Sequence, residues 1–227
     1  MIPLKADLPT RTVPFITVVL ILINVGVYFY QLSLGPSGWQ LFFSYGAIPY
    51  NMIHEFGVNG LPAPVVKSLF TSMFIHGGFF HVSGNMLYLW IFGNNVEDEF
   101  GHLRFLFFYL ICGVIAAYSH ALIDPSSKVP MVGASGAVSG VLGAYFLLFP
   151  RAKILTLLPI GFFITTIRIP AMVVLGFWVV GQFMWALSTP KGGGGVAWFA
   201  HIGGFLAGMF LLRYFRRPRP RWRGYMK

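Results

Sequence analysis

Six long apolar stretches constrain the fold of this chain more than any other feature of its sequence. A helix needs about 20 mostly apolar residues to cross the hydrocarbon core of a bilayer, and each stretch approaches that length. The stretches are residues 13–32, 78–95, 103–122, 131–149, 171–187 and 196–215. They predict an all-α membrane protein, a bundle of six transmembrane helices that forms a single domain over residues 1–227.

The charge content agrees with a membrane environment. Only 10% of the residues are charged and 56% are hydrophobic, whereas soluble domains carry about 25% charged residues. Much of the net charge of +10 lies at the end of the last apolar stretch and beyond it. We interpret the basic tail, residues 216–227, as a segment that meets anionic lipid. Because the basic residues are not interleaved with an aromatic face, we expect no nucleic-acid partner.

The distribution of Lys and Arg predicts the orientation in the membrane. With the N-terminus inside, only Lys67, Lys128 and Lys191 of the 16 basic residues fall on the outer side. The excess of positive charge on the inner side predicts that both termini are cytoplasmic. The first stretch is too long for a cleavable signal peptide and should stay as the first span. The aromatic-rich connection 33–67 should then lie outside and fold partly into the interface.

One further apolar segment, residues 154–167, is ambiguous. As a straight helix it would reach only about 21 Å, which is short of the hydrocarbon core of about 30 Å. It also carries Pro159 and Gly161 at its middle. We interpret it as a connector that skims the membrane interface.

The acidic and cysteine residues exclude several mechanisms. All six carboxylates lie outside the predicted spans, whereas proton-relay pumps and intramembrane aspartic proteases place acids within the bilayer. The H-E-x-x-H pattern of zinc proteases is absent from the sequence. The single cysteine, Cys112, lies in an apolar stretch, so we expect neither a disulfide nor a cysteine metal cluster.

Ser135 stands between glycines near the start of the fourth stretch, in the sequence Gly133-Ala-Ser-Gly136. Glycines beside a serine allow a tight turn and the close approach of a substrate main chain. The spacing of Gly136 and Gly140 is also the ordinary device for close helix packing. By itself, Ser135 is therefore either a nucleophile or part of a packing surface.

His201 lies in the last stretch, where a histidine is costly and is by default a functional candidate. Taken alone, it is equally well explained as a hydrogen-bonded structural residue. Gly204 and Gly208 follow it at the spacing that lets helices approach closely. If this helix packs on the glycine face of the fourth, His201 comes within hydrogen-bond reach of Ser135, as a serine nucleophile requires of its base.

The second stretch carries His81 and Asn85, which are four residues apart and therefore lie on one helix face. Both side chains can donate hydrogen bonds. With the backbone N–H of Ser135 they are candidates for the hole that binds the oxyanion of an acyl-transfer intermediate. His76, just before this stretch, we interpret as a structural hydrogen-bonding residue.

Taken in order, these motifs resemble those of the rhomboid family of intramembrane serine proteases. The matching residues are His81-x-x-x-Asn85, Gly133-Ala-Ser135-Gly136, and Ala200-His201 with Gly204 and Gly208. The run from Gly93 to Gly101 is also similar to the family's cytoplasmic turn, with Glu97 as its acid. The resemblance covers nearly the whole chain and implies a six-helix rhomboid-like bundle.

The resemblance implies a Ser–His dyad in which Ser135 is the nucleophile and His201 the general base, with His81 and Asn85 as oxyanion donors. It implies hydrolysis of peptide bonds in or next to transmembrane segments of other proteins, without a metal or organic cofactor. Some members of the family carry an aromatic residue one turn after the nucleophile. This chain has Ser139 there, so another group must orient His201.

Two alternatives stay open at this point. One is a non-catalytic relative that binds transmembrane helices. The other is a small transporter or channel, which is disfavoured because no acid lies in the spans and no paired broken helices recur in the two halves. The expected location is a prokaryotic inner membrane, with the bilayer and transmembrane substrates as partners. The sequence gives no prediction of the oligomeric state.

Overall fold

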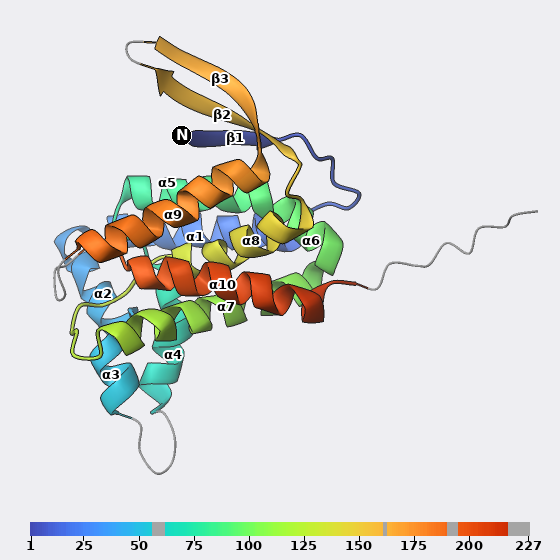
Figure 1. The fold of residues 1–227 in the computed structure, drawn as a ribbon. Helices are drawn as coiled ribbons and strands as arrows, with labels where there is room; N and C mark the ends of the chain where they lie inside the picture. The colour runs from blue at the N-terminus through green and yellow to red at the C-terminus, as the bar shows by residue number, and fades with distance from the viewer. Residues whose placement is uncertain (56–61, 161–162, 190–194, 218–227) are drawn as a thin grey trace, which may run out of the picture.

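The computed structural model describes residues 1–55, 62–160, 163–189 and 195–217. Figure 1 shows a bundle of helices with a small three-stranded sheet beside it. The long helices are α1 (Phe15–Ser33), α7 (His102–Ile123), α8 (Ser135–Leu148), α9 (Ala171–Ser188) and α10 (Trp198–Phe215). The predicted basic tail lies outside the described residues from position 218 onward.

Among the described residues, α1, α7 and α9 are long and apolar enough to cross a membrane. Helix α8 is apolar but shorter, with 14 residues. Its residues 137–145 are all buried, as expected for a helix that is apolar on every face. The chain is therefore a mainly helical membrane protein, while the count of six spans stays a prediction.

The second apolar stretch forms one continuous helical run in three parts. The parts are α5 (Phe79–Tyr88), the π-helical turn η3 (Leu89–Gly93) and α6 (Asn94–Phe100). The run extends beyond the predicted end at residue 95. It stops at Gly101, whose φ of +80° is a conformation that glycine adopts readily.

Short helices build the segment between α1 and α5. They are η1 (Gly35–Trp39), α2 (Gln40–Tyr45), α3 (Pro49–His54), α4 (Ala63–Thr71) and η2 (Ser72–Phe74). Prolines in the first turn begin η1, α3 and α4, where their missing N–H is not needed. Ala47 and Met52 pack with Ala121 of α7. The predicted outer loop 33–67 is therefore folded against the bundle, apart from residues 56–61, which lie outside the described part.

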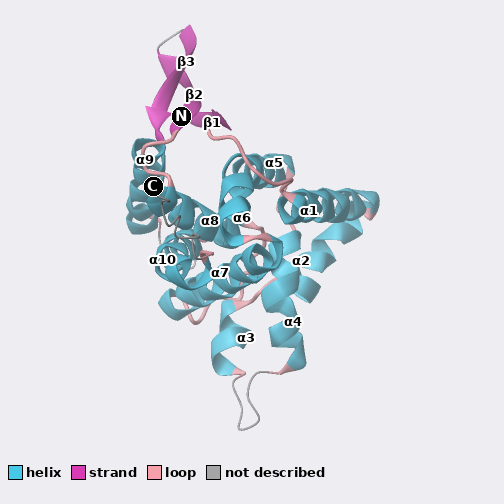
Figure 2. Cartoon of the chain, turned by 90° about the vertical axis from the view of Figure 1, so that its right-hand side faces the viewer, coloured by secondary structure: helices cyan, strands magenta, loops and turns pink. Residues whose placement is uncertain are grey.

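The prediction of an all-α chain is wrong, because three strands form an antiparallel sheet in the order β1-β2-β3. The strands are β1 (Ile2–Ala6), β2 (Lys153–Ile160) and β3 (Phe163–Pro170). The predicted connector 154–167 is thus the core of a β-hairpin, and the N-terminal strand pairs with it. Its many β-branched residues favour strands, and Pro159 disfavours a helix through its middle. Both views show the sheet at one side of the helical bundle, with the hairpin projecting from it (Figure 1, Figure 2). Ile154 of β2 is buried in the hydrophobic core.

Candidate active site

Ser135 is the first residue of α8, and the turn before it explains the glycine at position 133. Gly133 has a φ of +116°, which residues with a side chain rarely adopt. A Cβ there would lie 2.6 Å from Nε2 of His81, so a side chain has no room. The Gly133 N–H donates to the carbonyl of Ser72 at 2.9 Å. This turn fixes Ser135 at the N-terminus of α8, where it lines a cavity.

The cavity brings together the four residues predicted to carry chemistry. Ser135 of α8 and His201 of α10 line the same half-open space of about 1120 Å³. His81 and Asn85 of α5 line it as well. Most of the wall is apolar, and an apolar wall strengthens the electrostatic interactions made beside it. Residues from three separate helices therefore face one space that is large enough for a peptide segment.

Three side chains hold the imidazole of His201. Oε1 of Gln182 on α9 lies 2.7 Å from its Nδ1. The ring of Trp178 lies 6.0 Å away between centroids, tilted by 33°, and the ring of Trp198 stands edge-on at 6.1 Å. Ser139 donates its hydroxyl to a backbone carbonyl of α8 at 2.6 Å. The groups that orient the histidine thus come from α9 and from α10 itself.

Small residues let α10 approach α8 closely enough to bring His201 to the cavity. A Cβ on Gly204 would overlap the carbonyl oxygen of Gly136, and a Cβ on Gly208 would overlap that of Gly140. Close approach of two helix backbones through such residues is the main source of helix association in membranes. The four predicted packing glycines therefore lie at one contact between the two helices.

His81 and Asn85 present hydrogen-bond donors to the cavity. Nδ1 of His81 accepts the N–H of Gly77 at 3.3 Å, so in the neutral ring Nε2 carries the hydrogen. That Nε2 lies on the side of Gly133, just before Ser135. Asn85 is 7% exposed, and its Nδ2 has no hydrogen-bond partner among the described residues. Since buried donors are rarely left unpaired, Nδ2 of Asn85 is available to a molecule bound in the cavity, and His81 lines the same cavity beside it.

His76 supports the turn before Ser135 from behind. It is 1% exposed, and its Nε2 accepts the N–H of Ala134 at 3.4 Å. Its backbone exchanges two hydrogen bonds of 3.1 Å with the side chain of Gln31 on α1. Burial, assisted by the neighbouring His81, lowers the pKa of His76 to about 4, so the ring is neutral at pH 7. These contacts agree with the structural role predicted for it.

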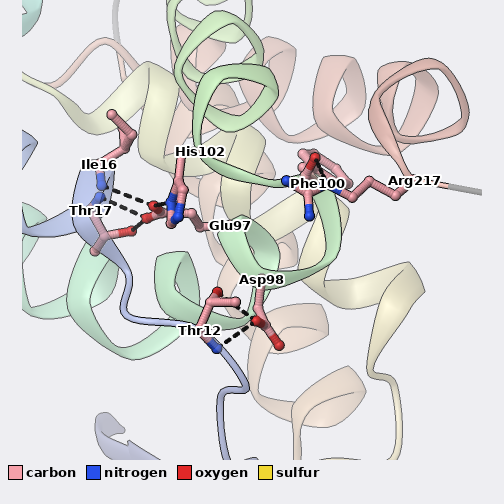
Figure 3. A network of polar contacts seen from close by, with 8 residues as sticks. All are labelled: Thr12, Ile16, Thr17, Glu97, Asp98, Phe100, His102 and Arg217. Atoms are coloured by element: carbon pink, nitrogen blue, oxygen red, sulfur yellow. Dashed lines mark hydrogen bonds and ion pairs between the residues drawn. The ribbon is translucent and has the colours of Figure 1, made fainter.

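Glu97 of α6 lies away from the cavity, beside the first turn of α1 (Figure 3). Its buried carboxylate accepts the N–H groups of Ile16 and Thr17 at 2.9 and 2.8 Å and the Thr17 hydroxyl at 2.7 Å. His102 Nδ1 lies 2.5 Å from it. Because α1 has no side-chain cap of its own, Glu97 satisfies its free N–H groups and complements its dipole. The turn around Glu97 therefore has a structural role: it connects α6 to the first turn of α1.

Sequence reasoning missed Gln182 and Gln31. Each is a polar residue inside a predicted span, which is a signal of function or pairing, but the partner follows only from the packing of the helices.

Cys112 is buried and forms no disulfide. No group of three or more His, Cys, Asp or Glu side chains in the described ranges is placed to hold a metal ion.

Comparisons with known proteins find similar sequences over much of the chain. A family model described as the Rhomboid domain matches residues 64–218. RHOMBOID-like protein 5 of Arabidopsis thaliana is 33% identical over 143 residues, which cover 63% of this chain and 42% of that protein. Rhomboid protease GluP of Bacillus subtilis is 28% identical over 198 residues, which cover 87% and 34%. Rhomboid protein 1, mitochondrial, of Saccharomyces cerevisiae is 32% identical over 151 residues, which cover 63% and 40%.

The chain therefore spans less than half the length of these relatives. They come from a bacterium, a plant and the mitochondria of yeast, so the matches are not restricted to prokaryotic membranes.

Proposed function

Because the chain belongs to the rhomboid family, we propose that it is an intramembrane serine endopeptidase that cleaves peptide bonds in or next to transmembrane segments. The observation that carries the proposal is that Ser135 and His201, from different helices, line one cavity with His81 and Asn85. A half-open cavity admits both water and an extended peptide, and hydrolysis needs both. The relative named Rhomboid protease GluP supports the reaction class.

In this proposal, His201 takes the proton of the Ser135 hydroxyl on Nε2 while the oxygen attacks the peptide carbonyl. Negative charge develops on the carbonyl oxygen. The backbone N–H of Ser135, Nε2–H of His81 and Nδ2–H of Asn85 donate to it. His201 then gives the proton to the leaving amine, which leaves an acyl group on Ser135. A water molecule, deprotonated by His201, then attacks the acyl carbonyl, the bond to Oγ of Ser135 breaks, and His201 returns the proton to that oxygen as the new carboxyl end leaves. The scheme uses no metal or organic cofactor.

The substrate class follows from the chemistry of helices in lipid. An intact helix uses its carbonyl groups in internal hydrogen bonds, and those groups are shielded from a nucleophile. We expect cleavage where a substrate helix unwinds locally, near small or helix-breaking residues at the end of a span. Replacing such residues in a model substrate by leucine should reduce its cleavage.

The orientation is part of the same proposal: six spans, both termini in the cytoplasm and segment 33–67 outside. The α5–η3–α6 run and α10 would supply spans beside α1, α7, α8 and α9. Cysteine accessibility on a Cys112→Ala background tests it, with Ser37→Cys as the probe. We expect a membrane-impermeant maleimide to label this probe from outside. Labelling from the cytoplasmic side alone would overturn the orientation.

Labelling with a serine-reactive fluorophosphonate tests the proposed activity. Purified protein in detergent should be labelled, and Ser135→Ala should not. Ser127→Ala is the matched control, because Ser127 also lines the cavity and has no role in the scheme. A folded protein that binds a transmembrane peptide but is neither labelled nor able to cleave it would favour the second candidate, a non-catalytic rhomboid relative that binds transmembrane helices.

A further inference from the structure

We propose that Gln182 is a positioning residue for His201. Its side-chain oxygen holds the imidazole in the tautomer that carries hydrogen on Nδ1 and leaves Nε2 free to act as a base. The inference rests on the proposed dyad and deepens it, because it names the group that takes the orienting place of the carboxylate in a catalytic triad.

The amide of Gln182 is itself anchored, and the anchor decides which of its atoms faces His201. Its Nε2 donates to the carbonyl of Trp178, one turn earlier on α9, at 3.2 Å. Oε1 is therefore the atom that lies 2.7 Å from Nδ1 of His201. An amide oxygen only accepts hydrogen bonds, so Nδ1 must be the donor. In a neutral imidazole this leaves Nε2 unprotonated, as general-base catalysis requires.

Packing limits the other orientations of the ring. Gln182 is 8% exposed, and leaving a buried amide oxygen without a hydrogen-bond donor is costly. Trp178 packs beside the imidazole, while Trp198 meets it edge-on. A rotation that tilts the ring out of its plane would break the bond to Gln182 and displace the ring from these two contacts, and a 180° flip of the ring would leave the Gln182 oxygen facing a carbon atom. The hydrogen bond and the aromatic contacts therefore favour the same orientation of His201.

The electrostatic surroundings suit a neutral partner. The other histidines on the cavity wall are His81 and His120, and the wall carries one carboxylate among the described residues, Asp124. The hydrogen bond of the His201 ring runs to Gln182. An amide can set the tautomer without placing a further charge in an apolar wall, where an unpaired charge is expensive.

A simpler role for Gln182 would be to hold α9 against α10. The two roles differ in what the loss of the oxygen changes. A positioning residue lowers the rate of the chemical step in a protein that stays folded. A residue that only joins two helices lowers stability and leaves the turnover of the folded molecules unchanged.

Steady-state cleavage of a fluorogenic transmembrane peptide separates the two roles. Gln182→Leu removes the acceptor at similar volume, and Gln182→Glu keeps an acceptor oxygen. We expect Gln182→Leu to lower kcat about ten- to a hundredfold with KM within about twofold, a part of what general-base catalysis contributes. Gln182→Glu should recover part of the rate, because it keeps the acceptor but loses the N–H that donates to Trp178. The matched control is Ser188→Ala, which removes an exposed hydroxyl bonded within the same helix and should behave as the wild type.

Two results of these assays would overturn the positioning role. One is an unchanged kcat in Gln182→Leu. The other is a loss of activity that only follows a lower midpoint of thermal unfolding. In a His201→Ala background, Gln182→Leu should have no further effect, since no imidazole is left to orient.

Nitrogen-15 NMR of the histidine rings reads the tautomer without any turnover, with the signals of His201 assigned by their loss in His201→Ala. We expect hydrogen on Nδ1 in the wild type and a mixture of tautomers in Gln182→Leu. The same tautomer in both proteins would overturn the inference. A clear difference in a protein that neither cleaves nor is labelled would refute the proposed protease and leave the action of Gln182 on the ring standing.

Discussion

A polar site lies near each end of α1, and the two sites differ in whether their polar groups have hydrogen-bond partners within the protein. At its first turn, the N–H groups of Ile16 and Thr17 donate to the buried carboxylate of Glu97. The Thr17 hydroxyl and His102 supply the remaining contacts. Both carboxylate oxygens are therefore paired within the protein, and this site is closed.

Near the other end of α1, Gln31 holds the backbone of His76 and so supports the wall of the cavity. This site is open. Nδ2 of Asn85 and Nδ1 of His120, both on side chains that line the cavity, have no partner among the described residues. A closed network contributes to stability, whereas unpaired donors are available to a bound molecule. Substitutions at the first site should therefore change unfolding, and those at the second should change turnover.

The largest effect should come from the dyad. Ser135→Ala and His201→Ala should each lower kcat by about 10³-fold or more, because the nucleophile and its base act as one unit. Thermal unfolding in detergent should stay close to that of the wild type for Ser135→Ala, whereas His201→Ala also removes the donor to Gln182 and should unfold at a somewhat lower temperature. The double variant should be no slower than either single one in the same cleavage assay. A double variant that is much slower would mean that the two residues do not form a dyad.

At the closed site, Glu97→Ala should lower the free energy of unfolding by about 3–5 kcal/mol, because it removes the carboxylate that accepts the hydrogen bonds of the buried groups around it. The N–H groups of Ile16 and Thr17 would then have no partner. The loss should appear as a large fall in the midpoint of thermal unfolding. Activity per folded molecule should change little at a temperature where the variant stays folded.

Asp98 supplies the matched control for Glu97. It accepts the N–H of Thr12 at 3.0 Å, the Thr12 hydroxyl at 2.7 Å and the N–H of Arg11 at 3.2 Å, but these bonds are exposed to solvent. Asp98→Ala should therefore cost about 1 kcal/mol or less. Equal losses at Asp98 and Glu97 would show that burial does not set the strength of these networks.

A smaller effect, confined to turnover, is expected at the open site. Asn85→Ala should lower kcat by roughly ten- to a thousandfold with little change in KM, as the loss of one oxyanion donor does elsewhere. Asn85→Leu should behave similarly. Because His81 and the N–H of Ser135 compensate in part, the double variant with His81→Ala should be far less active than either single one.

Thermal unfolding of the same variants tests whether Asn85 is structural instead of catalytic. If Asn85 were structural, as Glu97 is, its loss would lower the unfolding midpoint and leave the activity of the folded protein nearly intact. A double variant of His81 and Asn85 that is still active would exclude both residues from the oxyanion hole.

The sequence predicted the features that depend on local pattern. Apolar stretches mark the long helices because lipid demands uninterrupted apolar length. A histidine in a span and a serine between glycines are visible in the sequence because they are costly or unusual there. The placement of Ser135 and His201 on one cavity then follows from the glycines of α8 and α10, whose spacing the sequence also displays.

The features that the sequence did not predict depend on contacts between distant segments. Strand β1 pairs with β2 across most of the length of the chain, and the apolar run of the hairpin has no period that separates a strand from a short helix. The partner of Gln182 likewise follows only once α9 lies beside α10. Glu97 was expected as the acid of a turn, but its bonds to Thr17 depend on how α6 meets α1.

The smallest effect should come from the helix contact between the two sites. Helix α10 carries His201 at the cavity, and Arg216, directly after the end of the helix, contacts Glu99 of α6. Gly208 lies between them with its backbone against Gly140. Gly208→Ala must push the two helices apart, which should cost about 1–3 kcal/mol of stability. Since His201 lies two turns away on the same helix, kcat should also fall severalfold. Gly26→Ala in α1 is the control, because its Cβ would meet nothing within 4 Å; it should match the wild type or gain up to about 1 kcal/mol. Equal unfolding midpoints for the two variants would show that the α8–α10 contact tolerates a methyl group and does not fix the position of His201.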